Sequence, residues 1–352
     1  MRRPLELLVV SALVLMHAPA FSACAPFVFT NGVAPPACWR PFSLLSPFNK
    51  PLPANPRLHP DSKALVAWLG KASLPGPNDL QVIDTVRAPE LDYSKPTYYS
   101  RPDDPEYRLL FTMPYANKAL NGTALRIPAQ ALPAGGQDAH MTVIDPVRGL
   151  VFSLFGVRSK PLHGGVLSAF AGGVQPLSSD GVGGHGGTSA GFSNPLGLIR
   201  GAELMAGRID HALFAVVDCT NGQWQWPAVG PALACGASPV YNGMHFYLDM
   251  TPAEINALEL PPWRKTILRA MAEYGMFVGD TSGGQGARWQ VQPESGRTFS
   301  SFGKAIPLVE FARENGIPYG NGQYRMNLRD GIDWGRLKVL APCVARDGCL
   351  AN

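Results

Sequence analysis

From about residue 80 onward, apolar residues come in short runs separated by turn-forming residues. The runs predict β-strands over residues 80–86, 107–111, 124–127, 141–144, 150–155, 212–217 and 245–248. The segment Asp145-Pro-Val-Arg-Gly149 lies between two of these runs and predicts a hairpin turn. Many short strands joined by Gly- and Pro-containing turns favour a mainly β fold, either a β-sandwich or a jelly roll.

A few short helices interrupt this pattern. Asp61 precedes an apolar segment over residues 64–69, which ends at Gly70. Thr251-Pro-Ala-Glu254 has the composition of a capping box and predicts a helix start. A further helix is expected over residues 262–274, followed by a strand over 276–278 that leads to Asp280.

The chain divides into three regions by composition. Residues 1–20 predict a signal peptide, because Arg2 and Arg3 precede an apolar stretch over 5–16 and a small-residue cleavage site, Ala18-Pro-Ala20. Residues 21–75 form a proline-rich N-terminal arm with one short helix. Residues 76–352 form a single β-rich domain with a C-terminal extension. No stretch is long and apolar enough to predict a transmembrane segment, so we expect a secreted or periplasmic protein.

The cysteines agree with export. The mature chain keeps six, and an even number in an exported protein favours disulfides over metal binding, since no CxxC pair is present. Sequence neighbours give the pairing Cys24–Cys38, Cys219–Cys235 and Cys343–Cys349. One alternative concerns Cys24 alone: Phe21-Ser-Ala-Cys24 loosely resembles a lipoprotein cleavage site, which would anchor the protein through a lipid on Cys24.

Composition excludes several classes of protein. Charged residues are 16% of the chain, against about 25% in average soluble domains. The net charge is only +4 and no dense basic stripe is present, so a nucleic-acid partner is not expected. The 38 glycines and 34 prolines argue against a helical bundle or coiled coil. Nothing in the pattern bears on the oligomeric state.

Three histidines and one aspartate are the candidate catalytic residues. His185 lies in Asp180-Gly-Val-Gly-Gly-His-Gly-Gly-Thr188, where no neighbouring side chain shields the imidazole, so it is free for proton transfer. His140 and His211 each begin a predicted strand and would converge on one rim of a sandwich. Asp280 follows a helix and a strand and would act as the acidic partner. The alternative is structural: each imidazole bonds a nearby carbonyl.

No motif indicates a metal or a cofactor. The chain has no HExxH or His-x-His spacing, no Gly-Lys-Ser/Thr after its glycines, and no Gly-x-Ser-x-Gly turn. The prediction is therefore acid–base chemistry by side chains with no cofactor, and metal binding by the His and Asp side chains stays an open alternative.

Aromatic and basic residues supply a possible binding surface. Trp224 and Trp226 lie on one face of an extended segment, and paired indoles suit stacking against sugar rings, although tryptophans more often serve as core anchors. Arg200 and Arg208 would neutralise a sugar carboxylate. Tyr274 completes the predicted substrate-binding set.

Several motifs in fixed order resemble a family of exported, mostly bacterial proteins with no assigned chemistry. They are Gly183-Gly-His-Gly-Gly-Thr188, Ile199-Arg-Gly-Ala-Glu-Leu204, Ile209-Asp-His-Ala-Leu213, His140-Met141 with Ile144-Asp-Pro146, and Leu260-Pro-Pro262 through Tyr274-Gly-Met276 to Asp280. The resemblance covers roughly residues 120–285 and implies a secreted β-rich protein that acts on extracellular glycans. The chain departs from the family pattern at Phe152 and Phe155, where tryptophan is expected, and in a longer stretch between Thr188 and Ile199.

Two functions follow. The first is an exported carbohydrate-active enzyme, a glycan hydrolase or polysaccharide lyase that uses His and Asp acid–base chemistry. The alternative is a non-catalytic protein that binds a glycan or the cell wall through the same residues. Convergence of His140, His185, His211 and Asp280 around one cleft would favour the enzyme, and dispersal would favour binding.

The cysteine pairing is testable by thiol titration. We expect no reactive thiol in the denatured, non-reduced mature protein, because all six cysteines are paired. One free thiol would indicate a lipid on Cys24, and two or more would contradict the disulfide framework.

Overall fold

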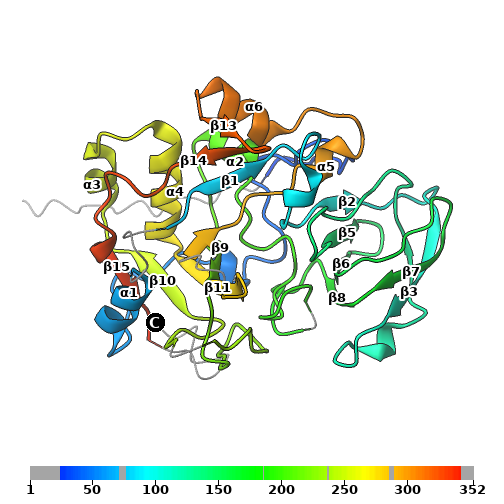
Figure 1. Ribbon diagram of the computed structural model, residues 1–352, viewed down its shortest axis with the longest axis horizontal. Helices are drawn as coiled ribbons and strands as arrows, with labels where there is room; N and C mark the ends of the chain where they lie inside the picture. The colour runs from blue at the N-terminus through cyan, green and yellow to red at the C-terminus, as the bar shows by residue number, and fades with distance from the viewer. Residues whose placement is uncertain (1–23, 71–76, 185, 236–237, 285–288, 342–352) are drawn as a thin grey trace, which may run out of the picture.

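The computed structural model describes residues 24–70, 77–184, 186–235, 238–284 and 289–341. The strands among these residues form four sheets, which are divided between two lobes (Figure 1). The predicted signal peptide and the pair Cys343–Cys349 lie outside the described residues. No helix in the described ranges is long and apolar enough to cross a membrane.

The first lobe, here called the sandwich lobe, consists of two sheets that share one hydrophobic core. One sheet has the order β2 (Thr97–Tyr99), β5 (Met141–Asp145), β6 (Leu150–Phe155) and β8 (Ala171–Pro176). The other has the order β4 (Ala124–Arg126), β3 (Glu106–Phe111) and β7 (Gly165–Ala169). Alternate residues of β3 are buried, as expected for a strand with one face on a core. The predicted hairpin after Asp145 is present, since β5 pairs antiparallel with β6.

The second lobe, here called the helical lobe, is built on a mixed five-stranded sheet. Its order is β12 (Trp289–Val291), β9 (Leu213–Val217), β11 (Met276–Thr281), β10 (His245–Leu248) and β15 (Leu337–Val339), with β9 and β11 parallel. A small sheet of β1 (Leu80–Ile83), β14 (Gln323–Met326) and β13 (Tyr319–Gly320) lies beside it. The prediction of a mainly β fold with a few short helices is confirmed.

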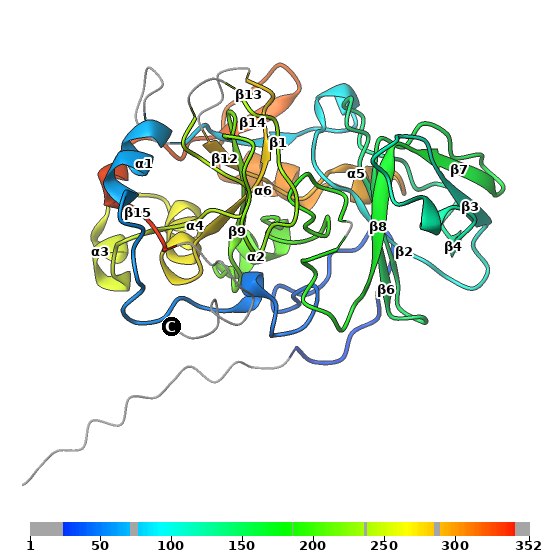
Figure 2. The same cartoon turned by 90° about the horizontal axis from the view of Figure 1, so that it is seen from below.

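Helices flank the sheets of the second lobe (Figures 1 and 2). They are α1 (Ser62–Leu69), α2 (Gly201–Ala206), α3 (Pro252–Ala257), α4 (Pro262–Glu273) and α6 (Pro307–Glu314), with α5 (Arg297–Ser300) nearer the sandwich. Single 3₁₀ turns occur at Pro47–Asn49, Pro89–Leu91, Lys118–Leu120 and Trp334–Arg336. The predicted capping box begins α3, where the Thr251 hydroxyl accepts from Glu254 N–H and the Glu254 carboxylate accepts from Thr251 N–H.

The proline-rich N-terminal arm runs across both lobes (Figure 2). At the sandwich lobe, the Asn31 side chain donates to Tyr99 O and accepts from Tyr99 N–H, each at 2.8 Å, and so pairs the free edge of β2. At the helical lobe, Ala341 N–H donates to Arg57 O at 2.8 Å and Leu58 bridges Leu340. The arm therefore ties the two lobes together from outside.

A buried ion pair fixes the middle of the arm. The Arg200 guanidinium donates to Glu203 Oε1 at 2.6 Å and to the carbonyls of Ala37 and Trp39 at 3.1 and 2.6 Å. Both charged side chains are almost inaccessible to solvent. Burial alone would raise the pKa of Glu203, but Arg200 and His211 outweigh that effect and hold the pKa below its ordinary value.

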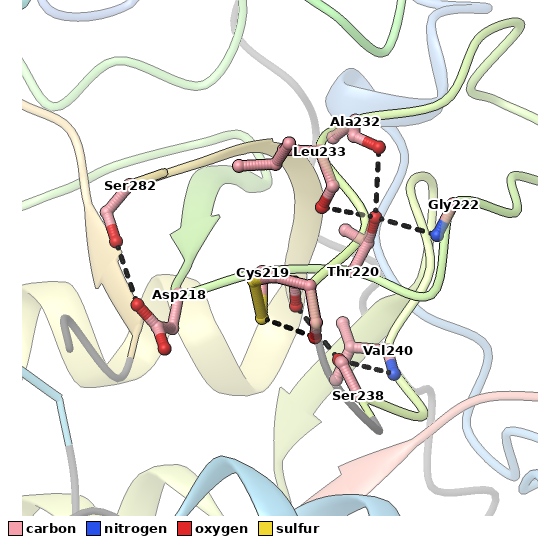
Figure 3. Close-up of a disulfide and its surroundings, with 10 residues drawn as sticks. Asp218, Cys219, Thr220, Gly222, Ala232, Leu233, Ser238, Val240 and Ser282 are labelled. Carbon is pink, nitrogen blue, oxygen red and sulfur yellow. Dashed lines mark hydrogen bonds between the residues drawn. A yellow bond between two sulfur atoms is a disulfide. The ribbon is translucent and has the colours of Figure 1, made fainter. Parts of the chain in front are cut away.

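Two disulfides match the predicted pairs, Cys24–Cys38 and Cys219–Cys235. Such bonds persist in oxidising compartments, so they fit an exported protein. The second closes the base of a long excursion from β9 that carries Trp224 and Trp226. Figure 3 shows the hydrogen bonds that reinforce this base, including Ser238 Oγ to Cys219 O at 2.9 Å and Ser282 Oγ to Asp218 Oδ1 at 3.3 Å.

The ion pair predicts a large loss of stability for Glu203→Gln. The substitution leaves the buried Arg200 charge uncompensated, which costs about 3–5 kcal/mol of unfolding free energy at neutral pH. Because the pKa of Glu203 is depressed in the folded state, its contribution should fade as pH falls through that pKa. Urea denaturation at several pH values measures both effects.

Glu254→Gln is the matched control, since Glu254 occupies the same capping-box position but is solvent-exposed. Its effect should be much smaller than that of Glu203→Gln. Equal losses from the two substitutions would contradict the assignment of Arg200–Glu203 as the anchor of the arm.

Candidate functional site

The candidate site is centred on Lys95, at the junction of the two lobes. Lys95 lies just before β2, and β2 pairs in parallel with β5, with Thr97 opposite Thr142. Thr142 N–H also donates to Pro96 O at 2.8 Å. Continuing this register by two residues places Lys95 beside His140, the residue that precedes β5.

The helical lobe supplies the other side of the site. The Lys95 ammonium donates to Gln292 Oε1 and lies 4.1 Å from the centroid of the Phe214 ring. The Phe214 ring lies directly against Gly279, where an added Cβ would be 2.3 Å from the ring. Glycine is therefore required at this position, immediately before Asp280. A bulge in the pairing of β9 with β11 lies at the same point and turns Asp280 out of the regular strand pattern.

Charge at the site is strongly affected by burial. Burial lowers the pKa of the Lys95 ammonium to about 8, although the carboxylates of Asp280, Asp138 and Asp92 oppose the shift. Burial likewise raises the pKa of Asp280 and of Asp138, and Lys95 moderates both shifts. Lys95 thus interacts electrostatically with two carboxylates whose pKa values are both raised by burial. Asp138 and Asp280 keep partial contact with solvent, whereas Lys95 is buried.

His140 contributes a neutral imidazole. Burial, and to a lesser degree the positive charge of Lys95, lowers the pKa of His140 to about 3. Its Nδ1 atom is buried and has no hydrogen-bond partner among the described residues. Ala139, between Asp138 and His140, has φ +39°, a left-handed conformation that alanine rarely adopts. Strain of this kind is often found where a side chain must be held in a fixed direction for function.

Asp280 is held by groups that follow the glycine-rich loop. Its Oδ1 accepts from Ser189 Oγ at 3.1 Å and from Thr281 N–H at 2.9 Å. Asn242 Nδ2 donates in turn to Ser189 Oγ at 3.3 Å. The Asp280 carboxylate is therefore fixed in orientation by the chain that leaves the loop.

The glycine-rich loop also contacts the other side of the site. Gly187 lies against the Asn194 side chain, and a Cβ there would be 2.2 Å from Asn194 Oδ1. Asn194 Nδ2 donates to Met141 O at 3.2 Å, next to His140, and to Leu154 O at 3.3 Å. His185 itself lies outside the described residues, so its catalytic role stays a prediction.

The predicted residues separate into two groups. His140 and Asp280 both interact electrostatically with Lys95, but His211 does not. Because β9 and β11 are parallel, the start of β9, where His211 lies, and the end of β11, where Asp280 lies, are at opposite ends of the sheet. The predicted convergence of His211 with the other candidates is therefore wrong.

His211 and the two arginines have other contacts. His211 Nε2 lies 3.0 Å from Glu203 Oε1 and its Nδ1 lies 2.9 Å from Ala212 O, so both ring nitrogens are occupied. Arg200 holds the arm, and Arg208 pairs with Asp210 at the surface. None of the three has a described contact with Lys95, Asp138 or Asp280.

The predicted aromatic residues lie elsewhere. Trp224 is half exposed, whereas Trp226 is partly buried and lines a cavity beside the N-terminal arm. Tyr274 is buried, and burial raises the pKa of its hydroxyl to about 12. Its backbone carbonyl accepts from His245 Nε2 at 2.9 Å.

Sequence reasoning missed Lys95 and gave no role to Asp138. Lys95 stands alone in a turn before Pro96, and nothing in the local pattern distinguishes it from a solvated lysine. The only nearby signal is the spacing of Asp138 and His140, two residues apart before a strand. Within the described ranges, no group of three or more His, Cys, Asp or Glu side chains is arranged to hold a metal ion.

No known protein family, curated protein or solved structure matches the chain. Function is therefore inferred from the geometry of the site itself.

Replacing Lys95 by methionine tests whether Lys95 carries a charge that is buried in the folded protein. The folded-state pKa lies near 8 and the ordinary value is 10.5, so the unfolded chain binds the proton more tightly between these values. The stability of the wild-type protein relative to Lys95→Met should therefore rise over this pH window, by on the order of 3 kcal/mol. Urea denaturation from pH 7 to 10.5 measures it, and a difference that does not change with pH would contradict the assignment.

Proposed function

We propose that the protein is an exported carbohydrate-active enzyme that hydrolyses a glycan with Asp138 and Asp280 as its acid–base pair. The observation that carries the proposal is the buried Lys95 amine between two carboxylates with raised pKa values, one from each lobe. Perturbed groups of opposite charge at a junction between lobes are more typical of active sites than of structural cores.

The chemistry of glycoside hydrolysis requires two carboxyl groups in different protonation states. Burial and, to a lesser degree, the charge of Asp138 raise the pKa of Asp280, so the pair suits a mechanism in which one carboxyl is protonated and the other is ionised. The protonated carboxyl donates its proton to the glycosidic oxygen as the bond to the anomeric carbon breaks. The ionised carboxylate either removes a proton from the attacking water or attacks the anomeric carbon itself.

Lys95 and His140 would assist this pair. The Lys95 ammonium stabilises whichever carboxylate is ionised, and it lies in a low-dielectric environment where that effect is strong. His140 stays neutral at any pH near 7, because burial lowers its pKa to about 3, and it therefore adds no charge to the site. Both residues would set the electrostatics of the site rather than transfer protons.

Three observations support a glycan as the substrate class. The disulfides fit export, where polysaccharides are found. Trp224 is 49% exposed, so an indole surface is available for stacking on a sugar ring. The resemblance to exported proteins of the kind described above points the same way.

A polysaccharide lyase is the second candidate, supported by the lowered pKa of Lys95. Above pH 8 the amine is largely neutral and is able to remove the proton next to a uronate carboxylate. The electron pair then forms a double bond as the glycosidic oxygen leaves with a proton from Asp138 or Asp280. Products distinguish the two reactions, because hydrolysis gives new reducing ends alone and elimination also gives ultraviolet-absorbing unsaturated sugars.

Substituting each aspartate tests the acid–base pair. We expect Asp138→Asn and Asp280→Asn each to reduce turnover by about 10²–10⁴-fold, the usual contribution of a general acid or base. Asp249→Asn, at an exposed position outside the site, should leave turnover unchanged. The assay screens purified protein against polysaccharides and measures reducing ends and ultraviolet absorbance.

The same assay decides between enzyme and binding protein. Full activity in both site variants would contradict the proposed pair. Absence of any product, with polysaccharide retained by the protein in a pull-down, would instead support the non-catalytic alternative.

A further inference from the structure

A cavity of about 160 Å³ lies between the N-terminal arm and the helical lobe, apart from the Lys95 site. Its walls come from arm residues 47–57, the turn at Trp226 and Pro227, the start of β10 and the chain after β15. The side chains that matter for its chemistry are Lys50, Arg57, Trp226, His245 and Phe277.

Aromatic side chains make one wall rigid. His245 stacks on Phe277 with ring centroids 3.9 Å apart and an interplanar angle of 22°. Gly243 has φ +80°, and a Cβ there would be 2.0 Å from Gln225 O, so glycine is required for the close approach of the turn that carries Trp226. The Cys219–Cys235 disulfide closes the base of the same excursion. The indole is thus presented by a constrained segment.

The two cations of the cavity have no partner among the described residues. Neither the Lys50 ammonium nor the Arg57 guanidinium makes a hydrogen bond or ion pair with a described side chain, and no carboxylate of the described residues lines the cavity. His245 donates from Nε2 to Tyr274 O at 2.9 Å, which leaves Nδ1 as a hydrogen-bond acceptor. The cavity therefore offers two cations, one acceptor and an aromatic face.

A second cavity, of about 270 Å³ in the sandwich lobe, shows why this pattern is informative. It is lined by Arg101, Arg126 and Arg148, but also by Glu106 and Asp145. Arg126 pairs with Glu106 at 3.2 Å and Arg148 with Asp145 at 2.6 Å. Two of its three cations are already compensated, whereas those of the arm cavity are not.

We propose that the arm cavity binds a carboxylated sugar, the uronic acid unit of an acidic polysaccharide. The carboxylate lies between Lys50 and Arg57, the ring packs on the Trp226 indole, and a hydroxyl donates to His245 Nδ1. This inference rests on the proposed function in one respect, because it names the class of glycan that the enzyme acts on.

Charge complementarity selects this ligand over a neutral sugar. An anion placed among uncompensated cations gains attraction without displacing an existing partner. Aromatic side chains favour the apolar face of a pyranose ring over a small inorganic anion. The carboxylate of the ligand is complementary to the two cations of the cavity, and its sugar ring is complementary to the aromatic face.

The test uses the full mature protein and two uronate trimers, of galacturonate and of mannuronate, with their methyl esters as neutral counterparts. Isothermal titration calorimetry measures affinity. We expect at least one free acid to bind at least about tenfold more tightly than its ester, since esterification removes only the charge. Lys50→Gln, Arg57→Gln and Trp226→Leu should each weaken binding by about tenfold.

Lys63→Gln is the matched control, because Lys63 is an exposed lysine on α1 that does not line the cavity. Its effect on affinity should be negligible. Equal binding of acid and ester, no binding of either trimer, or an equal loss in Lys63→Gln would each overturn the proposal.

Binding and catalysis are separable in this design. Uronate binding without cleavage of any glycan would sustain the inference and contradict the proposed enzyme. Cleavage of neutral glycans without uronate binding would support the proposed enzyme and contradict this inference. Asp280→Asn, which belongs to the Lys95 site, should retain the wild-type affinity for the trimer.

Discussion

The constraint that shapes the junction of the two lobes is the electrostatic cost of burying the Lys95 ammonium there. An isolated charge in that position would be strongly unfavourable. It is compensated from both sides, by Asp138 of the sandwich lobe and Asp280 of the helical lobe, and by the Gln292 oxygen and the Phe214 ring. The lowered pKa of Lys95 shows that this compensation is incomplete, so the buried charge by itself opposes the closed arrangement. The apolar cluster shared by the two lobes, in which Ile144 and Val151 pack with Phe214 and Phe277, holds the two sheets together against that cost.

Much of the fold could be predicted from local pattern, because local rules govern it. The alternating burial of β3, the hairpin after Asp145, the capping box at Thr251 and the first two disulfide pairs all depend on residues close together in sequence. The sequence pattern did not predict β2, β7, β8, β12, β13, β14 or β15, most of which are four residues long or shorter and carry little periodic signal. Of the helices, it predicted α1, α3 and α4 but not α2, α5 or α6.

The candidate site was predicted only in part, for a topological reason. His140 and Asp280 are candidates because each lies at the end of a predicted element, and both belong to the Lys95 site. His211 was grouped with them because it also begins a strand, but strand direction, which a single sequence does not supply, separates it from Asp280. Lys95 reaches the site through the pairing of β2 with β5, about 45 residues apart, and through packing on strands much later in the chain. Contacts between residues so far apart produce no recognisable pattern in the local sequence.

The contact between the N-terminal arm and the chain after β15 has a consequence for how the protein is made. Leu58 bridges Leu340, and His59 N–H donates to Val339 O at 2.9 Å, so two segments about 280 residues apart in the sequence are paired. Closing so long a loop is slow, and it requires the chain as far as Leu340 to have been made. Until then the arm cavity has no outer wall and the edge of β15 is uncovered. A truncated or prematurely released product would expose an edge strand suited to aggregation.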